Sequence, residues 1–316
     1  MKGNSDLHKA RQQGADEFYT SYDDISKEML FHKGVFKDKR VFLPCDDYKR
    51  SQFFRYFKEH FQKLGLKLLV AQSICPSYWV CYDGETETVY ETISGDFRSE
   101  SAAFHFQLCD IVVTNPPFSL FREFMQIVNS YHKDYLVIGN VNAITYKEVF
   151  PDIVSRRCIL GPSVRSGDRE FLVPDEYPLE GTACRYDEST DKRYIRVKGV
   201  RWFTTLPTYE FDVKRTQLLY DIKNHNYERF DTYDALNVNT TKEIPFDYDG
   251  VLGVPITALD KMDVFSHLVF ETLSGEVIYY NVIGMLNSGG RPEFFDFAKP
   301  IIDGKCKFKR ILIKRI

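Results

Sequence analysis

The clearest potential for chemistry in this sequence lies in four consecutive residues: Asn115, Pro116, Pro117 and Phe118. The β-branched run DIVVT at 110–114 precedes them and predicts a buried strand, and a helix-like pattern follows. Two consecutive prolines remove two backbone donors and hold an extended, rigid turn. Such a turn directs the Asn115 side-chain oxygen and the Pro116 carbonyl toward one point, where they can accept both hydrogens of an –NH2 group. Phe118 can then stack on a flat ring.

This arrangement suits methyl transfer to an aromatic amine, which is a poor nucleophile because its lone pair is delocalised into the ring. Two acceptors that hold the amine hydrogens favour the positive charge that develops on nitrogen, so positioning and electrostatics supply most of the catalysis. The tetrapeptide resembles the (D/N/S)PP(Y/F) motif of AdoMet-dependent amino-methyltransferases. Similar motifs occur in enzymes that methylate guanine amines in ribosomal RNA or glutamine in proteins, so the motif alone leaves the substrate open.

Four β-branched runs predict the strands that would position this turn. They are VFLPC (41–45), LKLLVAQ (66–72), DIVVT (110–114) and YLVIGNV (135–141). Apolar residues at helical spacing predict helices over 51–64 and 120–128, and the aromatic residues of the first are expected to face the core. This alternation predicts an α/β fold with a mostly parallel sheet, which places ligands at the carboxyl ends of its strands.

The pattern changes beyond about residue 205. Turn-rich pieces such as IPFDYDGVLGVPIT (244–257) and LNSGGRPEF (286–294) interrupt short apolar runs there. The sequence therefore predicts two regions, 1–205 and 206–316.

Charge is distributed unevenly along the chain. The 42 basic and 45 acidic side chains give a net charge of -3, which by itself argues against a nucleic-acid partner. Acidic residues gather in 83–100, whereas 192–201 and 305–316 hold five and six basic residues and no acid. Such segments can bind phosphates through their local field, and each can also be a solvated surface. In 305–309, the alternation of lysines with Cys306 and Phe308 is also typical of an edge strand.

Composition excludes several classes of protein. The chain is 43% hydrophobic with low net charge, which argues against disorder. Its apolar runs are far shorter than the roughly 18 to 20 residues that span a bilayer, and MKGNSDLHKA has no apolar core for a signal peptide. Seven cysteines without a CxxC pair predict free thiols in a reducing cytoplasm and no metal site.

Longer segments resemble one family, the EcoRI-type adenine-specific DNA methyltransferases of type II restriction systems. They follow one another in order as HKARQQGADEFYTSYDDI (8–25), CDDYKRSQFFRYF (45–57), GDFRS (95–99), DIVVTNPPFSLFREF (110–124), NVNAITYKEVF (140–150), YDALNVNTTKEIPFDYDGVLGVPIT (233–257) and GKCKFKRILIK (304–314). The resemblance implies a Rossmann-like AdoMet-dependent methyltransferase sheet in 1–205, mostly parallel with one antiparallel strand, and a DNA target-recognition region in 206–316. It also implies methylation of the N6 amine of a flipped adenine in a short duplex sequence, with GAATTC as one candidate, and protection from a cognate restriction enzyme.

The resemblance places S-adenosylmethionine against four segments of the chain. The implied cofactor residues are Phe18, Tyr19, Thr20, Cys45, Asp46, Asp47, Asp96, Phe97 and Asn115. The first three would line the methionine part, and the Asp96 carboxylate would accept from the cofactor's adenine amine. No glycine lies between Val41 and Phe61, where related enzymes carry a glycine-rich loop. An acid for the ribose hydroxyls is not evident, because 68–73 offers only Gln72.

The resemblance further implies a pocket for the flipped base and contacts to DNA. The base would stack on Phe118, with Phe171 and Tyr146 as candidates for the other wall and Asn142 as support. The candidate phosphate contacts are Lys9, Arg11, Arg165, Arg169, Lys305 and Lys307. The implied partner is double-stranded DNA, with no membrane and no obligate protein partner.

Other functions remain in competition on the residues alone. One is methyl transfer to another amine, such as guanine in ribosomal RNA, and another is a DNA-binding relative that has lost turnover. Pro44-Cys45 matches the nucleophile dipeptide of cytosine carbon-5 methyltransferases, but it ends a predicted strand where the cofactor belongs. Pro174-Asp175 with Glu180 hints at a nuclease pattern, but the lysine expected two residues after the glutamate is absent.

Overall fold

A computed structural model describes residues 19–165, 168–173, 183–208, 216–218, 225–261, 268–272, 277–286 and 296–316. The chain divides into two compact units, one of Met1–Asn140 and Gly161–Tyr209, the other of Val141–Leu160 and Glu210–Ile316. The sequence suggests a single boundary near residue 205, whereas the structure also groups 141–160 with the second unit. Among the helices described, none is long and apolar enough to cross a membrane.

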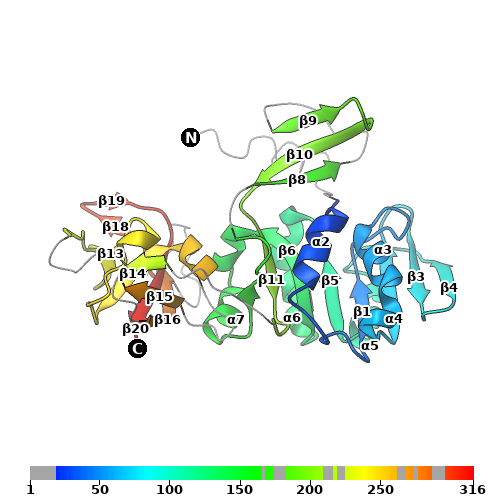
Figure 1. Cartoon of the computed structure of the whole chain (residues 1–316), viewed down its shortest axis with the longest axis horizontal. Helices are drawn as coiled ribbons and strands as arrows, with labels where there is room; N and C mark the ends of the chain where they lie inside the picture. The colour runs from blue at the N-terminus through cyan, green and yellow to red at the C-terminus, as the bar shows by residue number, and fades with distance from the viewer. Residues whose placement is uncertain are drawn as a thin grey trace. The chain divides into compact units, whose positions relative to one another are not determined.

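Four parallel strands form the centre of the first unit (Figure 1). They are β1 (Arg40–Leu43), β2 (Leu68–Ser73), β5 (Ile111–Thr114) and β6 (Asp134–Asn140). Each lies on a run that the sequence predicts as a strand. β1 pairs with β2 and β5, and β5 pairs with β6. All four residues of β5 are buried, as expected for a central strand whose two faces are both covered by helices.

The edges of this sheet are antiparallel. β3 (Tyr78–Tyr82) pairs with β2, β4 (Glu87–Glu91) pairs with β3, and β11 (Val200–Thr204) pairs with β6. Across this unit the strand order is β4-β3-β2-β1-β5-β6-β11. The expectation of one antiparallel strand is therefore wrong, because both β3 and β11 run against the central strands. The β3–β4 hairpin turns at Asp83-Gly84, where Gly84 has φ +102°, a signal that the sequence contains.

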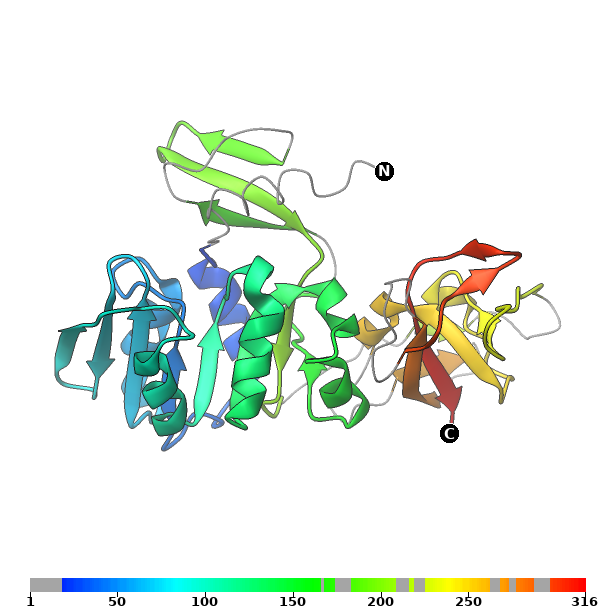
Figure 2. The ribbon, with the colours of Figure 1, turned by 180° about the vertical axis from the view of Figure 1, so that it is seen from behind.

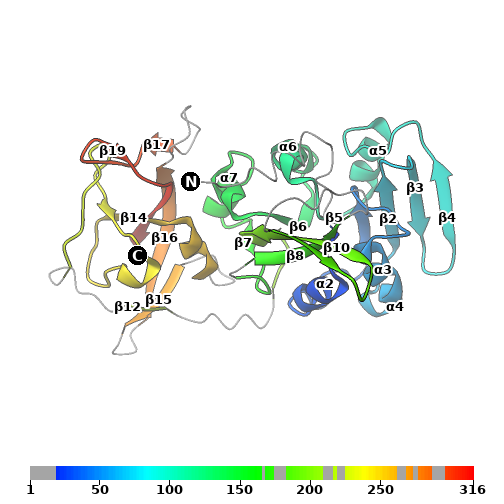
Figure 3. The same ribbon diagram turned by 90° about the horizontal axis from the view of Figure 1, so that it is seen from above.

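Helices cover both faces of the central strands. α2 (Tyr22–Met29), α3 (Gln52–Glu59) and α4 (Phe61–Leu64) lie on one face, and α5 (Glu100–Leu108) and α6 (Phe121–Ser130) on the other (Figure 3). Viewed from behind, α5 and α6 stand in front of the strands (Figure 2). The helix predicted over 51–64 is present but interrupted at His60. Its aromatic residues are core residues as expected, since Phe53, Phe54, Phe57 and Phe61 are all buried.

A small antiparallel sheet begins at the carboxyl edge of the parallel strands (Figure 1). Its strands are β8 (Asp168–Val173), β10 (Lys192–Lys198) and β9 (Cys184–Asp187), with β10 in the middle. β10 leads directly into β11, whose first residue Val200 pairs with Asn140, the last residue of β6. The Tyr19 N–H donates to the Leu172 carbonyl of β8 at 2.9 Å, which places the segment before α2 at the same edge.

The second unit contains a mixed sheet of order β12-β15-β16-β20-β14-β13, with β17 paired to β16. Its strands are β12 (Thr216–Leu218), β13 (Leu236–Asn237), β14 (Val251–Pro255), β15 (Leu268–Thr272), β16 (Val277–Leu286), β17 (Asp296–Ala298) and β20 (Arg310–Arg315). The unit also contains η2 (Val141–Thr145), α7 (Phe150–Val154), β7 (Ile159–Leu160), η4 (Thr241–Glu243), η5 (Ile256–Lys261), β18 (Ile301–Ile302) and β19 (Lys305–Cys306).

The second half of the basic segment 305–316 forms an inner strand of this sheet. β20 lies between β16 and β14 and pairs antiparallel with both. Ile311, Leu312 and Ile313 are fully buried. Arg310 is also buried, and its Nε donates to the Asn237 Oδ1 at 3.1 Å. Residues 310–315 are therefore not a free basic tail. Of 305–309, for which the sequence leaves an edge strand open, Lys305 and Cys306 form β19 of the two-stranded β18–β19 sheet, and 307–309 are not in a strand.

Candidate active site

The Asn-Pro-Pro-Phe turn follows β5 directly, between the carboxyl ends of β1 and β6. Asn115 is partly buried with its Oδ1 shielded from solvent, and Pro116 is buried. Pro117 adopts φ -52° and ψ 125°, and its carbonyl accepts from Leu120 N at 3.0 Å to start η1 (Phe118–Leu120). Phe118 is partly buried against the main hydrophobic cluster. The strand, turn and helix expected around this motif are therefore all present.

Asp46 and Asp47, which follow β1, have different surroundings. The buried Asp46 carboxylate accepts from the Ser51 and Thr114 hydroxyls, both at 2.6 Å. The Asp47 carboxylate accepts from the Tyr78 hydroxyl. Burial and this bond to a carboxylate raise the pKa of Tyr78 above its usual range. Cys45, which precedes them, is half-buried and is not in a disulfide.

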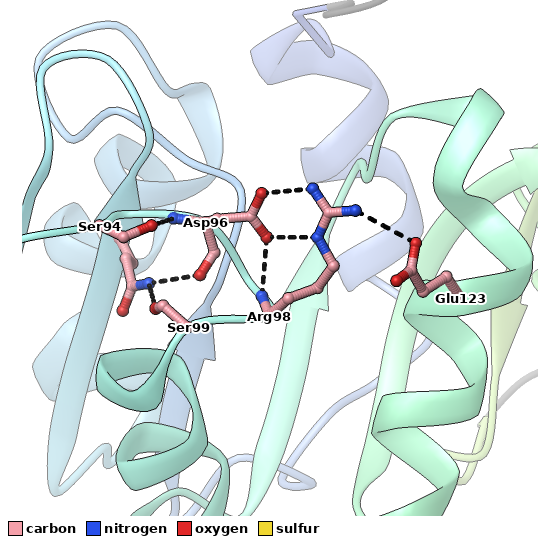
Figure 4. Close-up of polar contacts among 6 residues, drawn as sticks. Ser94, Asp96, Arg98, Ser99 and Glu123 are labelled. Carbon is pink, nitrogen blue, oxygen red and sulfur yellow. Dashed lines mark hydrogen bonds and ion pairs between the residues drawn. The ribbon is translucent and has the colours of Figure 1, made fainter.

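The loop before α5 brings Asp96 to the carboxyl end of β2. A Cβ on Gly95 would lie 1.6 Å from the Ser73 carbonyl oxygen, so only glycine allows this close approach. The Asp96 carboxylate receives Arg98 Nε at 2.8 Å and Nη2 at 2.6 Å, and also the Arg98 backbone N–H at 2.8 Å (Figure 4). These hydrogen bonds hold the pKa of Asp96 below its ordinary value. Asp96 is thereby kept as an anionic acceptor.

Arg98 also connects this loop to the helix after the Asn-Pro-Pro-Phe turn. Its Nη1 lies 3.3 Å from the Glu123 Oε2 in the first turn of α6 (Figure 4). The guanidinium also lies over the Phe97 ring, with its carbon 5.4 Å from the ring centroid. Arg98 is not among the site residues predicted from the sequence, although its position two residues after Asp96 is a visible signal.

Two other residues of this region lie in the core. Phe97 is buried and packs edge-to-face on Phe124, with ring centroids 5.4 Å apart. Gln72 is fully buried, and its Nε2 donates to the Asp96 carbonyl at 3.1 Å and to the Ser99 Oγ at 3.2 Å. Its Oε1 accepts from Ser101 Oγ at 3.2 Å. Gln72 therefore stabilises the Asp96 loop, and its side-chain amide forms its hydrogen bonds within the protein.

The N-terminal cofactor candidates are partly described. Phe18 lies outside the described residues. Tyr19 is half-buried and bonded through its backbone to β8. The Thr20 hydroxyl is buried and has no hydrogen-bond partner among the described residues. A buried hydroxyl of this kind is costly unless a ligand or water satisfies it.

The candidates for the base pocket belong to both units. Phe171 lies in β8 of the first unit and is 2% exposed, so its ring packs within the core. Asn142 lies in η2 and is exposed, and Tyr146 follows η2 and is partly buried. Both belong to the second unit.

The residues predicted to contact DNA differ in how far acidic side chains of the protein neutralise their positive charge. Lys9 and Arg11 lie outside the described residues, and Arg165 is partly buried. Arg169 Nε is 3.8 Å from Asp24, and Lys307 Nζ is 3.8 Å from Glu228, whereas Lys305 is exposed in β19.

The basic segment 192–201 faces acidic residues on neighbouring strands. Arg196 Nε lies 3.4 Å from Asp168 of β8, and Lys192 lies opposite Asp187 of β9 in the sheet register. Its local positive field is therefore weaker than the sequence suggests.

Comparison with known proteins supplies the family. A family model described as the adenine-specific methyltransferase EcoRI matches residues 6–92 and 83–316. The type II methyltransferase M.EcoRI of Escherichia coli is 38% identical to this chain, over 98% of this chain and 95% of its own length. The type II methyltransferase M.MpnI of Mycoplasma pneumoniae is 31% identical over 98% of both chains. No solved structure gives a significant match.

The matched segments span both units and include the Asn-Pro-Pro-Phe turn, and together they define an adenine-specific DNA methyltransferase of the type II restriction–modification class. The chain belongs to the EcoRI family of these enzymes. Members of this family use S-adenosylmethionine and act on DNA. The family assignment decides against ribosomal RNA guanine, a lapsed DNA-binding relative and cytosine carbon-5 chemistry as readings of the sequence. The residues of the nuclease-like pattern, 174–180, lie outside the described part of the chain.

Proposed function

We propose that this enzyme transfers a methyl group from S-adenosylmethionine to the N6 amine of an adenine flipped out of a short duplex sequence, and so protects that sequence from a cognate restriction enzyme. The observation that carries the proposal is the Asn-Pro-Pro-Phe turn at the carboxyl end of β5, flanked by parallel strands on both sides. We assign the first unit to the Rossmann-like methyltransferase fold, in which ligands bind at this edge of the sheet.

Atoms of the Asn-Pro-Pro-Phe turn itself position the adenine amine for methyl transfer. Asn115 Oδ1 and the Pro116 carbonyl accept the two hydrogens of the adenine amine, and Phe118 stacks on the base. Accepting these hydrogens stabilises the positive charge on nitrogen more in the transition state than in the ground state, which is the condition for acceleration. Because an adenine inside a duplex cannot reach this turn, the base must leave the stack.

The residues of the first unit fit the cofactor that the family uses. S-adenosylmethionine, when bound, supplies the methyl group on an already activated sulfonium. Asp96, held ionised by Arg98, would accept from the adenine amine of the cofactor. The buried Thr20 hydroxyl, with no partner among the described residues, would gain one from the methionine part beside Tyr19. Gln72 would not hold the ribose, because its amide is buried and bonded within the protein.

The region from residue 206 onward would recognise the target. Its exposed lysines, among them Lys305, would contact phosphates, and other side chains would contact base edges in a groove of the duplex. Asn142 and Tyr146 belong to the same unit.

The role of Asn115 is tested by Asn115→Ala, with Asn129→Ala on α6 as the control that removes an equal side chain elsewhere. Single-turnover methyl transfer from tritiated S-adenosylmethionine to duplex DNA should fall by roughly a hundredfold or more in Asn115→Ala. DNA affinity should stay near that of the wild type, and Asn129→Ala should keep its turnover. Wild-type turnover in Asn115→Ala would remove Asn115 from the catalytic role.

The target is tested by sequencing modified adenines in DNA from cells that express the enzyme. A single short sequence methylated throughout would support site-specific transfer, and GAATTC is the first sequence to compare. Methylation scattered without a common sequence, or label in ribosomal RNA alone when purified RNA and duplex DNA are offered together, would contradict the proposal.

A further inference from the structure

Asp46 stands at a junction of four elements in the first unit. It follows β1, and its backbone N–H donates to the Gln72 carbonyl of β2 at 2.9 Å. One carboxylate oxygen accepts from the Ser51 hydroxyl at 2.6 Å, and the other accepts from the Thr114 hydroxyl of β5 at 2.6 Å. The residue is only 7% exposed. Both oxygens therefore hold hydroxyl groups of the protein.

The two hydroxyl groups have structural duties of their own. Ser51 is the N-cap of α3, and its oxygen accepts from Phe54 N at 3.1 Å while its proton goes to Asp46. Thr114 is the last residue of β5 and immediately precedes Asn115. A charged acceptor forms shorter and stronger hydrogen bonds than a neutral one, so this carboxylate fixes the Thr114 side chain firmly.

The Thr114 bond fixes the point from which the Asn-Pro-Pro-Phe turn departs. Pro116 and Pro117 restrict the chain on the far side of Asn115, because each ring fixes its own φ and limits the residue before it. Asn115 thus lies between a side chain anchored to Asp46 and a rigid pair of prolines. A small displacement of a positioned group lowers the rate of transfer far more than it weakens the binding of either reactant.

We infer that Asp46 is a positioning residue that orients the catalytic Asn115 through Thr114, and that it does not touch the cofactor. This inference rests on the proposed role of Asn115. It differs from the role that the family resemblance implies, in which Asp46 lines the cofactor site.

The test removes the Thr114 hydroxyl and little else. Thr114→Val keeps the branched shape, and Thr114→Ser restores the hydroxyl. Thr204→Val is the matched control, because Thr204 is also fully buried and its hydroxyl donates to the Tyr135 carbonyl at 3.0 Å. Thr204 pairs with Leu136 of β6, which pairs in turn with Val113 of β5, so the control position lies at nearly the same level of the sheet as Thr114 but two strands away from it.

Two quantities are measured, the single-turnover rate of methyl transfer and the calorimetric Kd for S-adenosylmethionine. Thr114→Val should lower the rate about tenfold, a barrier increase of about 1.4 kcal/mol, with a Kd within about threefold of the wild type. Thr114→Ser should recover most of the rate, and Thr204→Val should keep both values. Asp46→Asn should likewise lower the rate of methyl transfer and leave the Kd for S-adenosylmethionine nearly unchanged.

Either of two results would overturn the inference. One is a wild-type rate in Thr114→Val, and the other is a Kd raised tenfold or more in Asp46→Asn, which would make Asp46 a cofactor ligand. If Asp46→Asn does not fold, as judged by circular dichroism, the Thr114 variants decide alone. Loss of activity in Asn115→Ala with a normal rate in Thr114→Val would reject this inference and retain the proposed function, whereas a normal rate in Asn115→Ala would reject the proposed function itself.

Discussion

Replacing Arg98 by methionine should weaken the binding of S-adenosylmethionine without slowing methyl transfer at saturation. The change removes the two side-chain bonds to Asp96, at 2.8 and 2.6 Å, and leaves the backbone bond at 2.8 Å. Methionine retains the unbranched apolar stem as far as the position of Nε, and it lacks the guanidinium that lies over Phe97. The Asp96 carboxylate then has to be immobilised again when the cofactor binds.

The size of this effect follows from the exposure of the pair. The Arg98 side chain is 42% exposed and that of Asp96 is 17% exposed, so solvent screens part of the attraction. Immobilising one side chain costs about 0.5 to 1.5 kcal/mol, and a central value of about 1 kcal/mol corresponds to a roughly fivefold higher Kd.

Calorimetric titration with S-adenosylmethionine measures the Kd, and a rapid-quench assay at saturating cofactor measures the rate. Glu123→Gln is the comparison, because it removes only the 3.3 Å ion pair to α6 and should change the Kd less than about twofold. A wild-type Kd in Arg98→Met would refute the reasoning that Arg98 prepares Asp96 for the cofactor. A lower rate with an unchanged Kd would move Arg98 from the cofactor site to the catalytic turn.

Three further results are expected. Burial lowers the pKa of His105 to about 4, below its ordinary value near 6.5. Between these two values the folded state binds fewer protons than the unfolded state, so the free energy of unfolding should fall by at most about 3 kcal/mol as the pH drops from 6.5 to 4. Urea unfolding at several pH values should show this loss reduced in His105→Gln. Gly95→Ala should lower the melting temperature and weaken cofactor binding together, because its Cβ would meet the Ser73 carbonyl at 1.6 Å; wild-type values for both would contradict the close approach. Lys305→Ala should lower DNA affinity and reduce the slope of log K against log salt by about one, and an unchanged slope would show that Lys305 makes no phosphate contact.

The sequence predicts the centre of the first unit well, because a strand buried on both faces leaves a continuous β-branched run. β1, β2, β5 and β6 all fall on such runs. Residues 141–160 could not be assigned in the same way, because they belong to the second unit through contacts that join distant parts of the chain. Lys309 Nζ donates to Thr145 Oγ1 at 2.8 Å, and Arg156 Nη2 donates to Asn281 Oδ1 at 2.6 Å.

The candidate site likewise contains residues that sequence motifs predict and residues whose role only the fold shows. Asn115 and Asp96 can be selected from the sequence because each lies in a recognisable motif. Their supporting residues, Thr114 and Arg98, are adjacent or nearly so in sequence, but only the fold shows what they do. The Thr114 hydroxyl meets a carboxylate 68 residues earlier in the chain, and Arg98 meets a glutamate 25 residues later.

The place of β20 has a consequence for how the second unit folds. This strand follows every other strand of its sheet along the chain, yet it pairs in the middle, between β14 and β16. Until residues 310–315 have been synthesised, β14 and β16 each have an unpaired edge of the kind that associates with other chains. Closing the sheet also requires pairing between distant segments, which is slow. During synthesis, the second unit should therefore reach its native sheet late and be most exposed to aggregation just before it does so.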